Sequence, residues 1–452
     1  MTKLATLERN QLVTHGKLYL TVSQNNQPQK RNDHAMTKML SKYRVLDITQ
    51  FVAGPTSSRI MAELGADVIK VELFPTGDHA RRSGLQAKNE NIKQCTQSTY
   101  FAQHNHSKRS IALNLKSEKG QSIIKQLVGQ SDVLIENFAP GVIGRMGLSY
   151  DEVKAVNPEI IMCSISFAGQ RGPLSKEPGF DYMAAAYAGI TEMVGESDRP
   201  PSQVSMAVGD SATGISAAMA VMAALLHREH TGKGQYIDCS LLDTYLQMHE
   251  DYIPRVGIRG EAALPKRSGS QHPNGGPTGI FDCGDGTFIQ MMVMPYQWPR
   301  LTEAIQMPEL MNDPRFDSPR QRRENKFDLQ NIIEKWMKSI GCRDKILEIL
   351  RKTRVPVAPV LTLQEAISHP HATKRGAIRH LDDPFIGKFP IPGQPPLFSD
   401  WSYSKRLKAP LLGEHNEEVL TTICGMEKEE ISELIKDGVI VADPTLRNYS
   451  QE

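Results

Sequence analysis

The stretch RVLDITQFVAGPTSSRIMAELGADVIKVEL (residues 44–73) decides the fold of this chain. Residues 44–49 are rich in β-branched side chains, which predicts a strand. GPTS at 54–57 supplies a turn and helix caps, and residues 58–64 then predict a helix. DVIKVEL at 67–73 predicts a second strand. This order indicates a βαβ unit, in which the two strands are parallel and the crossover is right-handed.

The same alternation continues through the first half of the chain. Further strands are predicted over 110–115, 132–136 and 160–164, and helices over 117–129 and 150–156. We therefore predict an α/β fold with a doubly wound, Rossmann-like large domain. No GxGxxG pattern follows the first strand, so the residues do not indicate a Rossmann cofactor loop.

The second half of the chain has a different composition. Residues 254–279 are dense in Gly, Pro, Arg and Ser, which indicates a linker, and 278–293 then predict a hairpin. Helices are predicted over 299–305, 325–339, 343–351, 414–424 and 427–437, an extended segment over 356–360 and a short strand over 439–441. We predict a flexible N-terminal extension (1–42), the large α/β domain (43–240), linkers and a smaller α+β domain (241–365), and a C-terminal return to the large domain (366–452).

Composition limits the classes of partner. Among 452 residues, 53 are Lys or Arg and 51 are Asp or Glu, and a net charge of +2 gives no global attraction to nucleic acid. The six cysteines are scattered without a CxxC pair, so we expect a reducing compartment, the cytoplasm, rather than a disulfide framework. The longest weakly polar run, Ala212–Leu226, is too short for a membrane span, so we expect a buried helix and no membrane partner.

Residues 1–42 are polar, with few acidic side chains and no apolar core of a secretory signal. We expect a disordered extension, or a true start at Met36 or Met39. The alternative is an organellar transit peptide, which would place the protein in the mitochondrial matrix.

Asp181 stands where a helix is predicted to begin, in GFDYMAAAYAGI (179–190). A carboxylate there either caps the helix by accepting backbone N–H bonds or serves as a nucleophile that the helix dipole keeps ionised. The residues alone leave both interpretations open. Two HxH pairs, at 104–106 and 369–371, have no third ligand at metal-site spacing, so we predict no metal site.

Two loops are candidates for ligand contact. NFAPG at 137–141 follows a strand at the edge of the sheet where open α/β folds bind ligands. NGG at 274–276 is either an ordinary turn or a lid that closes over a reactive intermediate. Basic residues at strand ends, among them Lys116 and Arg145, are either phosphate contacts or solvated charges.

Seven segments occur in a fixed order between residues 43 and 440. They are VLDITQFVAGP (45–55), LGADVIKVE (64–72), NHSKRSIALNLKSEKG (105–120), DVLIENFAPGVIGRMGL (132–148), GFDYMAAAYAGI (179–190), TGKGQYIDCSLLD (231–243) and APLLGEHNEEVL (409–420). With them the chain resembles the class III CoA-transferases, the family of formyl-CoA:oxalate, carnitine and succinyl-CoA-dependent transferases.

The resemblance implies that Asp181 is the nucleophile and that coenzyme A arrives as acyl-CoA, a substrate, with no permanently bound cofactor. The CoA contacts that it implies are Gln50, Val52, Ala53, Leu113, Asn114, Leu115, Lys116, Asn137, Phe138 and Arg145. Asn274, Gly275 and Gly276 would take the place of the family's glycine-rich active-site loop. The resemblance also implies an interlocked homodimer, two chains threaded through each other, acting on acyl-CoA and a carboxylic acid.

The chemistry of such a transfer suits an aspartate. A carboxylate that attacks a thioester forms a mixed acyl anhydride, which retains the energy of the thioester, whereas a Ser ester would be too stable to pass the acyl group on. Because anhydrides hydrolyse readily, the site must exclude water, and a glycine-containing flap meets that need. We expect succinyl-CoA or another short dicarboxylyl-CoA as the donor.

One feature departs from the pattern of the family, and another distinguishes the transferase from a related racemase. Leu73 stands where several relatives carry an Arg near the adenosine phosphate, and Arg81 or Arg82 is the expected substitute. The α-methylacyl-CoA racemase pairs the same Asp with a His about thirty residues upstream as a second acid–base group, and no His occurs at 150–154, which favours a transferase. The sequence is also compatible with a non-catalytic CoA-binding subunit and with a thioesterase.

Overall fold

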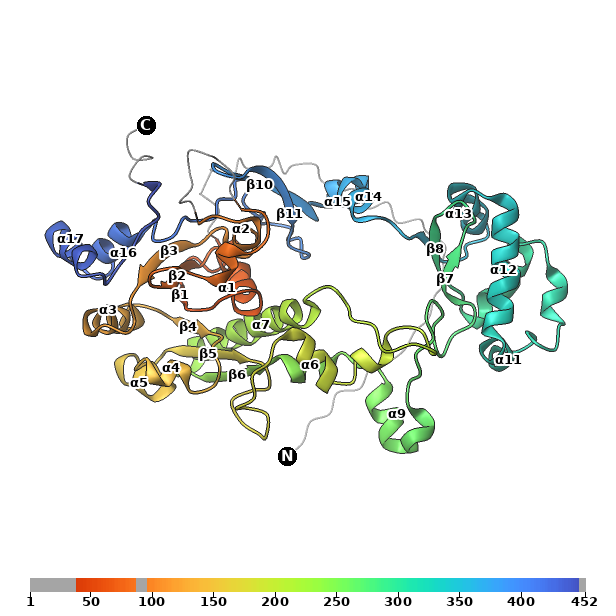
Figure 1. The fold of residues 1–452 in the computed structure, drawn as a ribbon, viewed down its shortest axis with the longest axis horizontal. Coiled ribbons are helices and arrows are strands. Elements are labelled where there is room, and N and C mark those ends of the chain that lie inside the picture. Colours follow the sequence, from red (N-terminus) through yellow and green to blue (C-terminus); the bar gives the residue numbers. More distant parts are fainter. Residues whose placement is uncertain (1–37, 87–95, 447–452) are drawn as a thin grey trace, which may run out of the picture. The chain divides into compact units, whose positions relative to one another are not determined.

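The structure, a computed structural model, describes residues 38–86 and 96–446 (Figure 1). Most of the predicted extension over 1–42 therefore lies outside the described residues. The strands are β1 (Arg44–Asp47), β2 (Asp67–Leu73), β3 (Arg109–Leu113), β4 (Val133–Glu136), β5 (Ile161–Ser166), β6 (Tyr236–Ser240), β7 (Thr278–Asp282), β8 (Phe288–Met292), β9 (Val357–Pro359), β10 (Ile378–Asp383) and β11 (Gly387–Pro392). The helices are α1 (Ala53–Glu63), α2 (Thr99–Asn105), α3 (Glu118–Gly129), α4 (Val142–Arg145), α5 (Tyr150–Val156), α6 (Asp181–Tyr187), α7 (Val208–Thr231), α8 (Leu241–Gln247), α9 (Tyr252–Arg259), α10 (Trp298–Ala304), α11 (Pro319–Glu324), α12 (Lys326–Ile340), α13 (Arg343–Lys352), α14 (Leu363–Ser368), α15 (Pro370–Arg375), α16 (Asn416–Thr422) and α17 (Lys428–Lys436).

The largest sheet has six parallel strands in the order β3-β2-β1-β4-β5-β6. This confirms the predicted α/β fold with a parallel sheet. The order reverses between β1 and β4, and in open α/β sheets ligands bind outside the carboxyl ends of the strands at such a switch point. The topology alone therefore predicts a ligand-binding site at this edge of the sheet.

Helices cover both faces of this sheet (Figure 1). Successive residues of β1 point to opposite faces, so Val45 packs in one core with Met61 of α1, whereas Leu46 packs in another with Ile123 of α3 and Val419 of α16. Parallel strands that are buried on both faces need apolar residues in both directions, and the near-continuous apolar runs in the sequence meet that need.

Helix α1 starts earlier than the sequence predicts. The predicted helix covers 58–64, but α1 spans Ala53–Glu63, so GPTS forms its first turn instead of a preceding turn. Proline is tolerated in a first turn because its missing N–H has no partner there. A side chain at Gly54 would lie 2.3 Å from Thr49 Cβ, so only glycine lets the helix begin directly against the loop that leaves β1.

Helix α7 is longer than the predicted buried helix over 212–226, and only one of its faces is buried. By length and composition alone it could cross a membrane, although 44% of its apolar window is buried in the protein. Its small residues pack against α1, where a side chain at Gly214 would lie 2.6 Å from the Ala53 carbonyl oxygen. Ile215, Met219 and Leu226 are exposed on the other face.

A second, antiparallel sheet has the order β7-β8-β9, and α10, α12 and α13 contribute to its core. The predicted hairpin over 278–293 is confirmed by the pairing of β7 with β8. Met291 belongs to this core, whereas Met292 and Met294 are exposed.

The predicted strand over 439–441 is wrong in extent. Only an isolated bridge forms there, between Ile440 and Leu113, with Asn114 donating its backbone N–H to Val439 O at 2.8 Å. Because β3 is the edge strand of the large sheet, this segment covers an otherwise open edge.

Candidate active site

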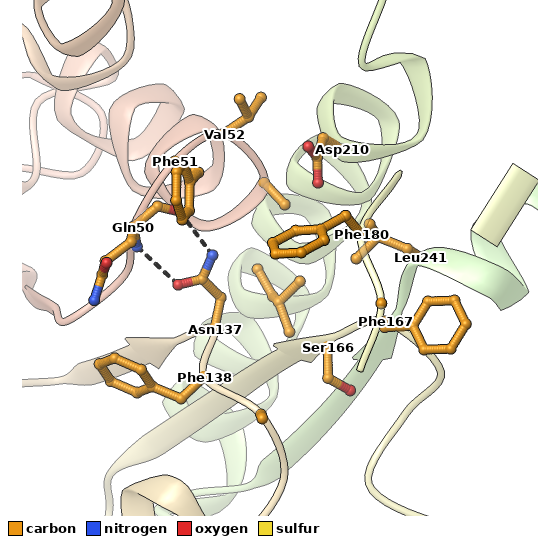
Figure 2. A pocket seen from close by; sticks show the side chains of 14 residues that line it. Gln50, Phe51, Val52, Asn137, Phe138, Ser166, Phe167, Phe180, Asp210 and Leu241 are labelled. Atoms are coloured by element: carbon orange, nitrogen blue, oxygen red, sulfur yellow. Dashed lines mark hydrogen bonds between the residues drawn. The ribbon is translucent and has the colours of Figure 1, made fainter. Parts of the chain in front are cut away.

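A cavity of about 250 Å³ opens at the carboxyl ends of β1 and β4, where the strand order reverses (Figure 2). Its lining includes Gln50, Phe51, Val52, Ala53, Asn137, Phe138, Ser166, Phe167, Phe180 and Asp210. Five of the ten predicted CoA contacts, Gln50, Val52, Ala53, Asn137 and Phe138, therefore meet in one cavity. Their contact with CoA itself stays a prediction.

Asn137 joins the two loops that form this cavity. Its Oδ1 accepts the backbone N–H of Gln50 at 2.7 Å, and its Nδ2 donates to the Gln50 carbonyl oxygen at 2.8 Å (Figure 2). Both bonds mimic strand pairing, so the amide holds the loop after β1 beside the loop after β4. An Asp or Leu at this position would lose at least one of the two bonds.

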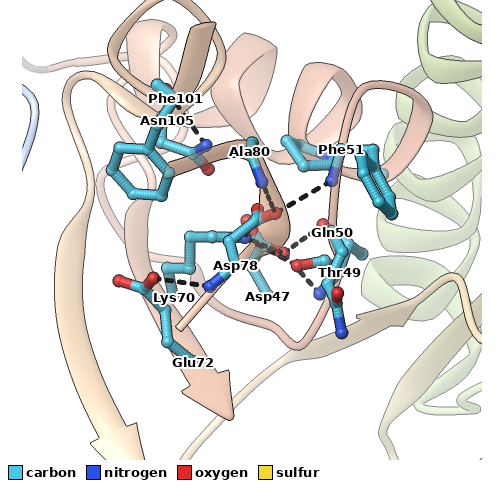
Figure 3. Close-up of polar contacts among 12 residues, drawn as sticks. Asp47, Thr49, Gln50, Phe51, Lys70, Glu72, Asp78, Ala80, Phe101 and Asn105 are labelled. Carbon is cyan, nitrogen blue, oxygen red and sulfur yellow. Dashed lines mark hydrogen bonds and ion pairs between the residues drawn. The ribbon is translucent and has the colours of Figure 1, made fainter. Parts of the chain in front are cut away.

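The loop after β1 is strained at Phe51, whose φ of 64° lies in the left-handed region that few non-glycine residues adopt. The Phe51 N–H donates to Asp78 Oδ1 at 3.1 Å, and Asp78 is paired with Lys70 at 3.1 Å (Figure 3). Lys70 Nζ in turn donates to the Thr49 carbonyl oxygen at 2.7 Å. Buried charges thus hold the loop backbone on both sides of Gln50.

Asp47 is the centre of this buried cluster and is fully buried. Its carboxylate accepts hydrogen bonds from Lys108 Nζ at 2.8 Å, Ser58 Oγ at 2.6 Å and the Thr49 N–H at 2.9 Å. Burial alone would raise the pKa of Asp47, but the attraction of Lys108 and Lys70 outweighs burial and holds that pKa well below its ordinary value. Asp47 is therefore ionised at every physiological pH.

Asp181 is the first residue of α6, and its side chain is only 4% exposed. The interpretation of Asp181 as the cap of its own helix is wrong, because Phe180 occupies the cap position. Instead, Asp181 Oδ1 accepts the backbone N–H of Asp210 at 2.8 Å, in the first turn of α7. The carboxylate thus caps a neighbouring helix that is distant in sequence.

The hydroxyl of Tyr245 in α8 lies 3.1 Å from Asp181 Oδ1 and 3.0 Å from Oδ2. Burial raises the pKa of Asp181, and the hydrogen bonds from Asp210 N–H and Tyr245 lower it in part. Burial also raises the pKa of Tyr245 to about 12, so the hydroxyl keeps its proton and can donate it to the carboxylate. Oδ1 therefore has two donors, and Oδ2 has only the shared hydroxyl among the described residues.

Gly209 permits this arrangement. Its N–H donates to the Tyr245 hydroxyl oxygen at 3.0 Å. A Cβ on Gly209 would lie 2.1 Å from Tyr245 Cε2 and 2.4 Å from Asp181 Oδ1, closer than any real contact. A glycine is therefore required where α7 begins against Asp181.

A second carboxyl, that of Asp210, lines the cavity beside Asp181. Burial raises the pKa of Asp210 to about 7, and the negative charge of Asp181 adds to the rise. Asp210, Tyr245 and Gly209 had no place in the sequence-based site. The one sequence signal at Asp210 is an acidic residue in the first turn of the long apolar helix, a position that is usually explained by the helix dipole alone.

The remaining predicted CoA contacts do not line this cavity. Leu113, Asn114, Leu115 and Lys116 lie at the end of β3 and in the loop after it, and Arg145 ends α4. Leu113 and Leu115 are buried in the core, whereas Lys116 and Arg145 are exposed. Because the strands are parallel, the loop after β3 lies at the same edge of the sheet as the cavity.

Of the two expected substitutes for the missing Arg at Leu73, Arg81 is only 1% exposed and donates to both oxygens of Glu72, each at 2.7 Å. It also lies over the Phe101 ring, 3.5 Å from the centroid. Arg81 is therefore a structural residue that a phosphate cannot reach. Arg82 is exposed and remains the candidate.

The loop at 274–276 precedes β7 and does not line the cavity of its own chain. Asn274 Nδ2 lies 3.4 Å from the Tyr252 hydroxyl, and a side chain at Gly276 would lie 2.6 Å from the Arg322 carbonyl oxygen. The predicted lid is thus packed within the second half of the chain.

The histidine pairs do not assemble ligands. His104 is buried with its Nδ1 3.4 Å from Thr56 Oγ1, and burial lowers its pKa to about 3. Within residues 38–86 and 96–446, no group of three or more His, Cys, Asp or Glu side chains is arranged to hold a metal ion.

Comparison with known proteins finds similarity along most of this chain. The model of the family "CoA-transferase family III" matches residues 40–416. The chain is 32% identical to succinyl-CoA:glutarate CoA-transferase of Mus musculus over 91% of this chain and 92% of that protein. It is 34% identical to formyl-CoA:oxalate CoA-transferase of Streptomyces coelicolor over 89% and 99%, respectively. The solved structure of a CAIB/BAIF family protein from Brucella suis is similar with a TM-score of 0.73 and 31% identity, covering 84% of this chain and 98% of that one.

Proposed function

Because the chain belongs to CoA-transferase family III and is a CoA-transferase, we propose that it moves CoA from an acyl-CoA donor to a carboxylic acid through covalent intermediates on Asp181. The observation that carries the mechanism is the buried Asp181 carboxylate, held at Oδ1 by the start of α7 beside a cavity at the switch point of the sheet. Oδ2, with one donor, is the nucleophilic oxygen.

The reaction divides into four acyl exchanges that balance without water. Asp181 Oδ2 attacks the thioester carbonyl carbon, the C–S bond breaks, and its electron pair leaves on the CoA thiolate. The thiolate then attacks the Asp181 side-chain carbonyl, which releases the donor acid and leaves an aspartyl-CoA thioester. The acceptor carboxylate attacks that thioester, the C–S bond breaks, and a second anhydride and the CoA thiolate form. The thiolate then attacks the acceptor's acyl carbon in this anhydride, which gives the new acyl-CoA and releases the Asp181 carboxylate.

The residues of this chain orient the Asp181 carboxylate and exclude water from the site. The hydrogen bonds from the Asp210 N–H and the Tyr245 hydroxyl fix the carboxylate against rotation, which contributes orientation before any substrate binds. The exposure of only 4% at Asp181 leaves little room for water near an anhydride. In this proposal the Gln50–Ala53 loop lies against CoA through its backbone, Asn137 contacts the nucleotide and pantetheine regions, and the loop after β3 holds the adenosine portion.

A homodimer, interlocked as in the resembling family, completes this proposal. Exposed apolar side chains surround Asp181 on α6, including Tyr182, Met183 and Tyr187, and α7 exposes Ile215 and Met219. A surface of this kind favours coverage by a second copy, whose 274–276 loop would then close the site. Light scattering of the purified protein checks the dimer. We place the enzyme in the cytoplasm, or in the mitochondrial matrix if 1–42 is a transit peptide.

The test is an acceptor-dependence assay with succinyl-CoA as donor and glutarate, oxalate and related acids as acceptors, followed by mass spectrometry of the acyl-CoA products. We expect a new acyl-CoA only when an acceptor is present. Free CoA formed without an acceptor would indicate a thioesterase. Deuterium incorporation at the α-carbon of a branched acyl-CoA without an acceptor would indicate a racemase, and binding without turnover a non-catalytic subunit.

The Gly209→Ala variant is expected to lower kcat by about 10²-fold, because the added methyl must displace Asp181 or Tyr245 by about an ångström. Steady-state transfer assays measure the loss. Gly129→Ala is the matched control, since its Cβ would meet only Val156 Cγ1, at 3.6 Å. Equal activity of the two variants would show that the start of α7 does not position the nucleophile.

A further inference from the structure

Two carboxyl groups from different helices meet at the cavity, and the mechanism above uses only one. Asp181 opens α6 and Asp210 lies in the first turn of α7. The Asp210 backbone N–H donates to Asp181 Oδ1 at 2.8 Å, so the Asp181 carboxylate is anchored to the backbone of the residue that carries the second carboxyl.

The two side chains differ in what they face. Asp210 lines the cavity, together with Gln50, Phe51 and Asn137 (Figure 2), whereas Asp181 is not among the residues that line it. Among the described residues, no donor is bonded to the Asp210 carboxyl oxygens, in contrast to the three hydrogen bonds at Asp181. The Asp210 carboxyl is thus half-buried, free of protein partners and directed at the space where a substrate must lie.

The surroundings of Asp210 favour its neutral form. The titratable groups that face it are Asp181 from α6, Tyr245 from α8 and Tyr100 from α2. None of them is a cation, and Asp181 is an anion. Burial first and the Asp181 charge second raise the pKa of Asp210 to about 7, so near neutrality a large share of Asp210 carries a proton.

We propose that Asp210 is a second catalytic residue of this site, whose carboxyl group donates a hydrogen bond to the oxygen of the thioester carbonyl group whose carbon Asp181 attacks. The inference rests on the proposed function, because it assigns a donor to the same acyl transfer. When Oδ2 of Asp181 bonds to the carbonyl carbon, the carbonyl π electrons move to oxygen, and this oxygen needs a donor until the C–S bond breaks. The proton stays on Asp210 throughout, so no proton is gained or lost.

A neutral Asp210 also explains how the site admits acids. The acceptor is itself a carboxylate. An ionised Asp210 beside Asp181 would repel this acceptor in a poorly solvated cavity. A protonated Asp210 removes that repulsion and offers the acceptor a hydrogen bond. Ionisation of Asp210 reverses both effects, so transfer is expected to decline as the pH rises through about 7.

Two variants test this proposal in the full-length protein, with succinyl-CoA and glutarate as substrates. Asp210→Ala removes the donor and is expected to lower kcat on the order of 10²-fold at pH 6. Asp210→Asn keeps an N–H donor but has no ionisation, so we expect most of the wild-type activity at pH 6 and no decline above pH 7. The wild type is expected to lose about tenfold per pH unit above that point. Asp344→Asn, an exposed residue in the first turn of α13, is the matched control.

Comparison of wild type and Asp210→Asn cancels the titration of CoA and of the acids, which is common to both. The proposal is overturned if Asp210→Ala keeps kcat within about threefold of the wild type, or if Asp210→Asn shows the same alkaline decline. It is also overturned if acyl adducts trapped by hydroxylamine map to Asp210, which would make Asp210 the nucleophile. Absence of any transfer or adduct in the wild type would instead refute the proposed function itself. Thermal unfolding of each variant confirms that a loss is not a loss of folding.

Discussion

The Asp181→Ala variant is expected to lose CoA transfer almost completely, with kcat lowered on the order of 10⁴-fold or more. Without the carboxylate no anhydride can form, and no other described side chain occupies its place between α6 and α7. CoA binding and the dimer are expected to persist, because Gln50, Asn137 and their loops are held by hydrogen bonds that do not involve Asp181. Steady-state transfer assays and calorimetric titration with CoA measure the two quantities separately.

Asp181→Asn strengthens this test, because its amide oxygen can still accept the Asp210 N–H and the Tyr245 hydroxyl. It is expected to fold like the wild type and to be equally inactive. Asp151→Asn, in the exposed first turn of α5, is the control. In the wild type, an acyl group trapped during turnover should map to Asp181 by mass spectrometry. Transfer at more than about a tenth of the wild-type rate in either Asp181 variant would remove Asp181 from its role as nucleophile.

The Asp47→Ala variant is expected to lower the free energy of unfolding by about 3–5 kcal/mol, because it leaves Lys108 buried without its counterion and Lys70 with Asp78 alone. Urea denaturation measures this loss. The low pKa of Asp47 in the fold also predicts a pH dependence. Its stabilising contribution is fully present above the unfolded pKa of about 4 and is lost as the pH falls below that value toward the folded pKa.

The exposed pair of Lys119 and Asp437 supplies the contrast. Lys119 Nζ and Asp437 Oδ2 are 2.6 Å apart, but both side chains are at least half exposed. Asp437→Ala is therefore expected to lower the free energy of unfolding by less than about 1 kcal/mol. The double variant Asp47→Ala, Lys108→Met should recover part of the lost stability, since it removes a buried charge that Asp47→Ala leaves unpaired. A loss below about 1 kcal/mol for Asp47→Ala alone would mean that the cluster is hydrated rather than dry.

Local patterns predicted the elements well where burial and periodicity coincide. The strands at 44–47 and 67–73 were recognisable because parallel strands are apolar on both faces. The start of α1 was not recognisable, because Gly54 and Pro55 normally indicate a turn, and only contact with Thr49 makes them a first helical turn. The predicted extent of the strand over 439–441 was wrong for a related reason, because its partner, the edge strand β3, is more than 300 residues away in sequence.

The sequence alone determined the α/β sheet and the family resemblance and led to the prediction that Asp181 is the nucleophile, because each depends on patterns within short segments of the chain. Only the tertiary structure decided what surrounds Asp181. Tyr245 and Asp210 reach it from positions 64 and 29 residues further on, and Gly209 matters through a distance to two other helices. The same holds for Arg81, which looked available for phosphate until its burial against Glu72 was visible. A hydrogen bond or a pKa depends on distance and solvent in three dimensions, and neither quantity is contained in the spacing of residues along a chain.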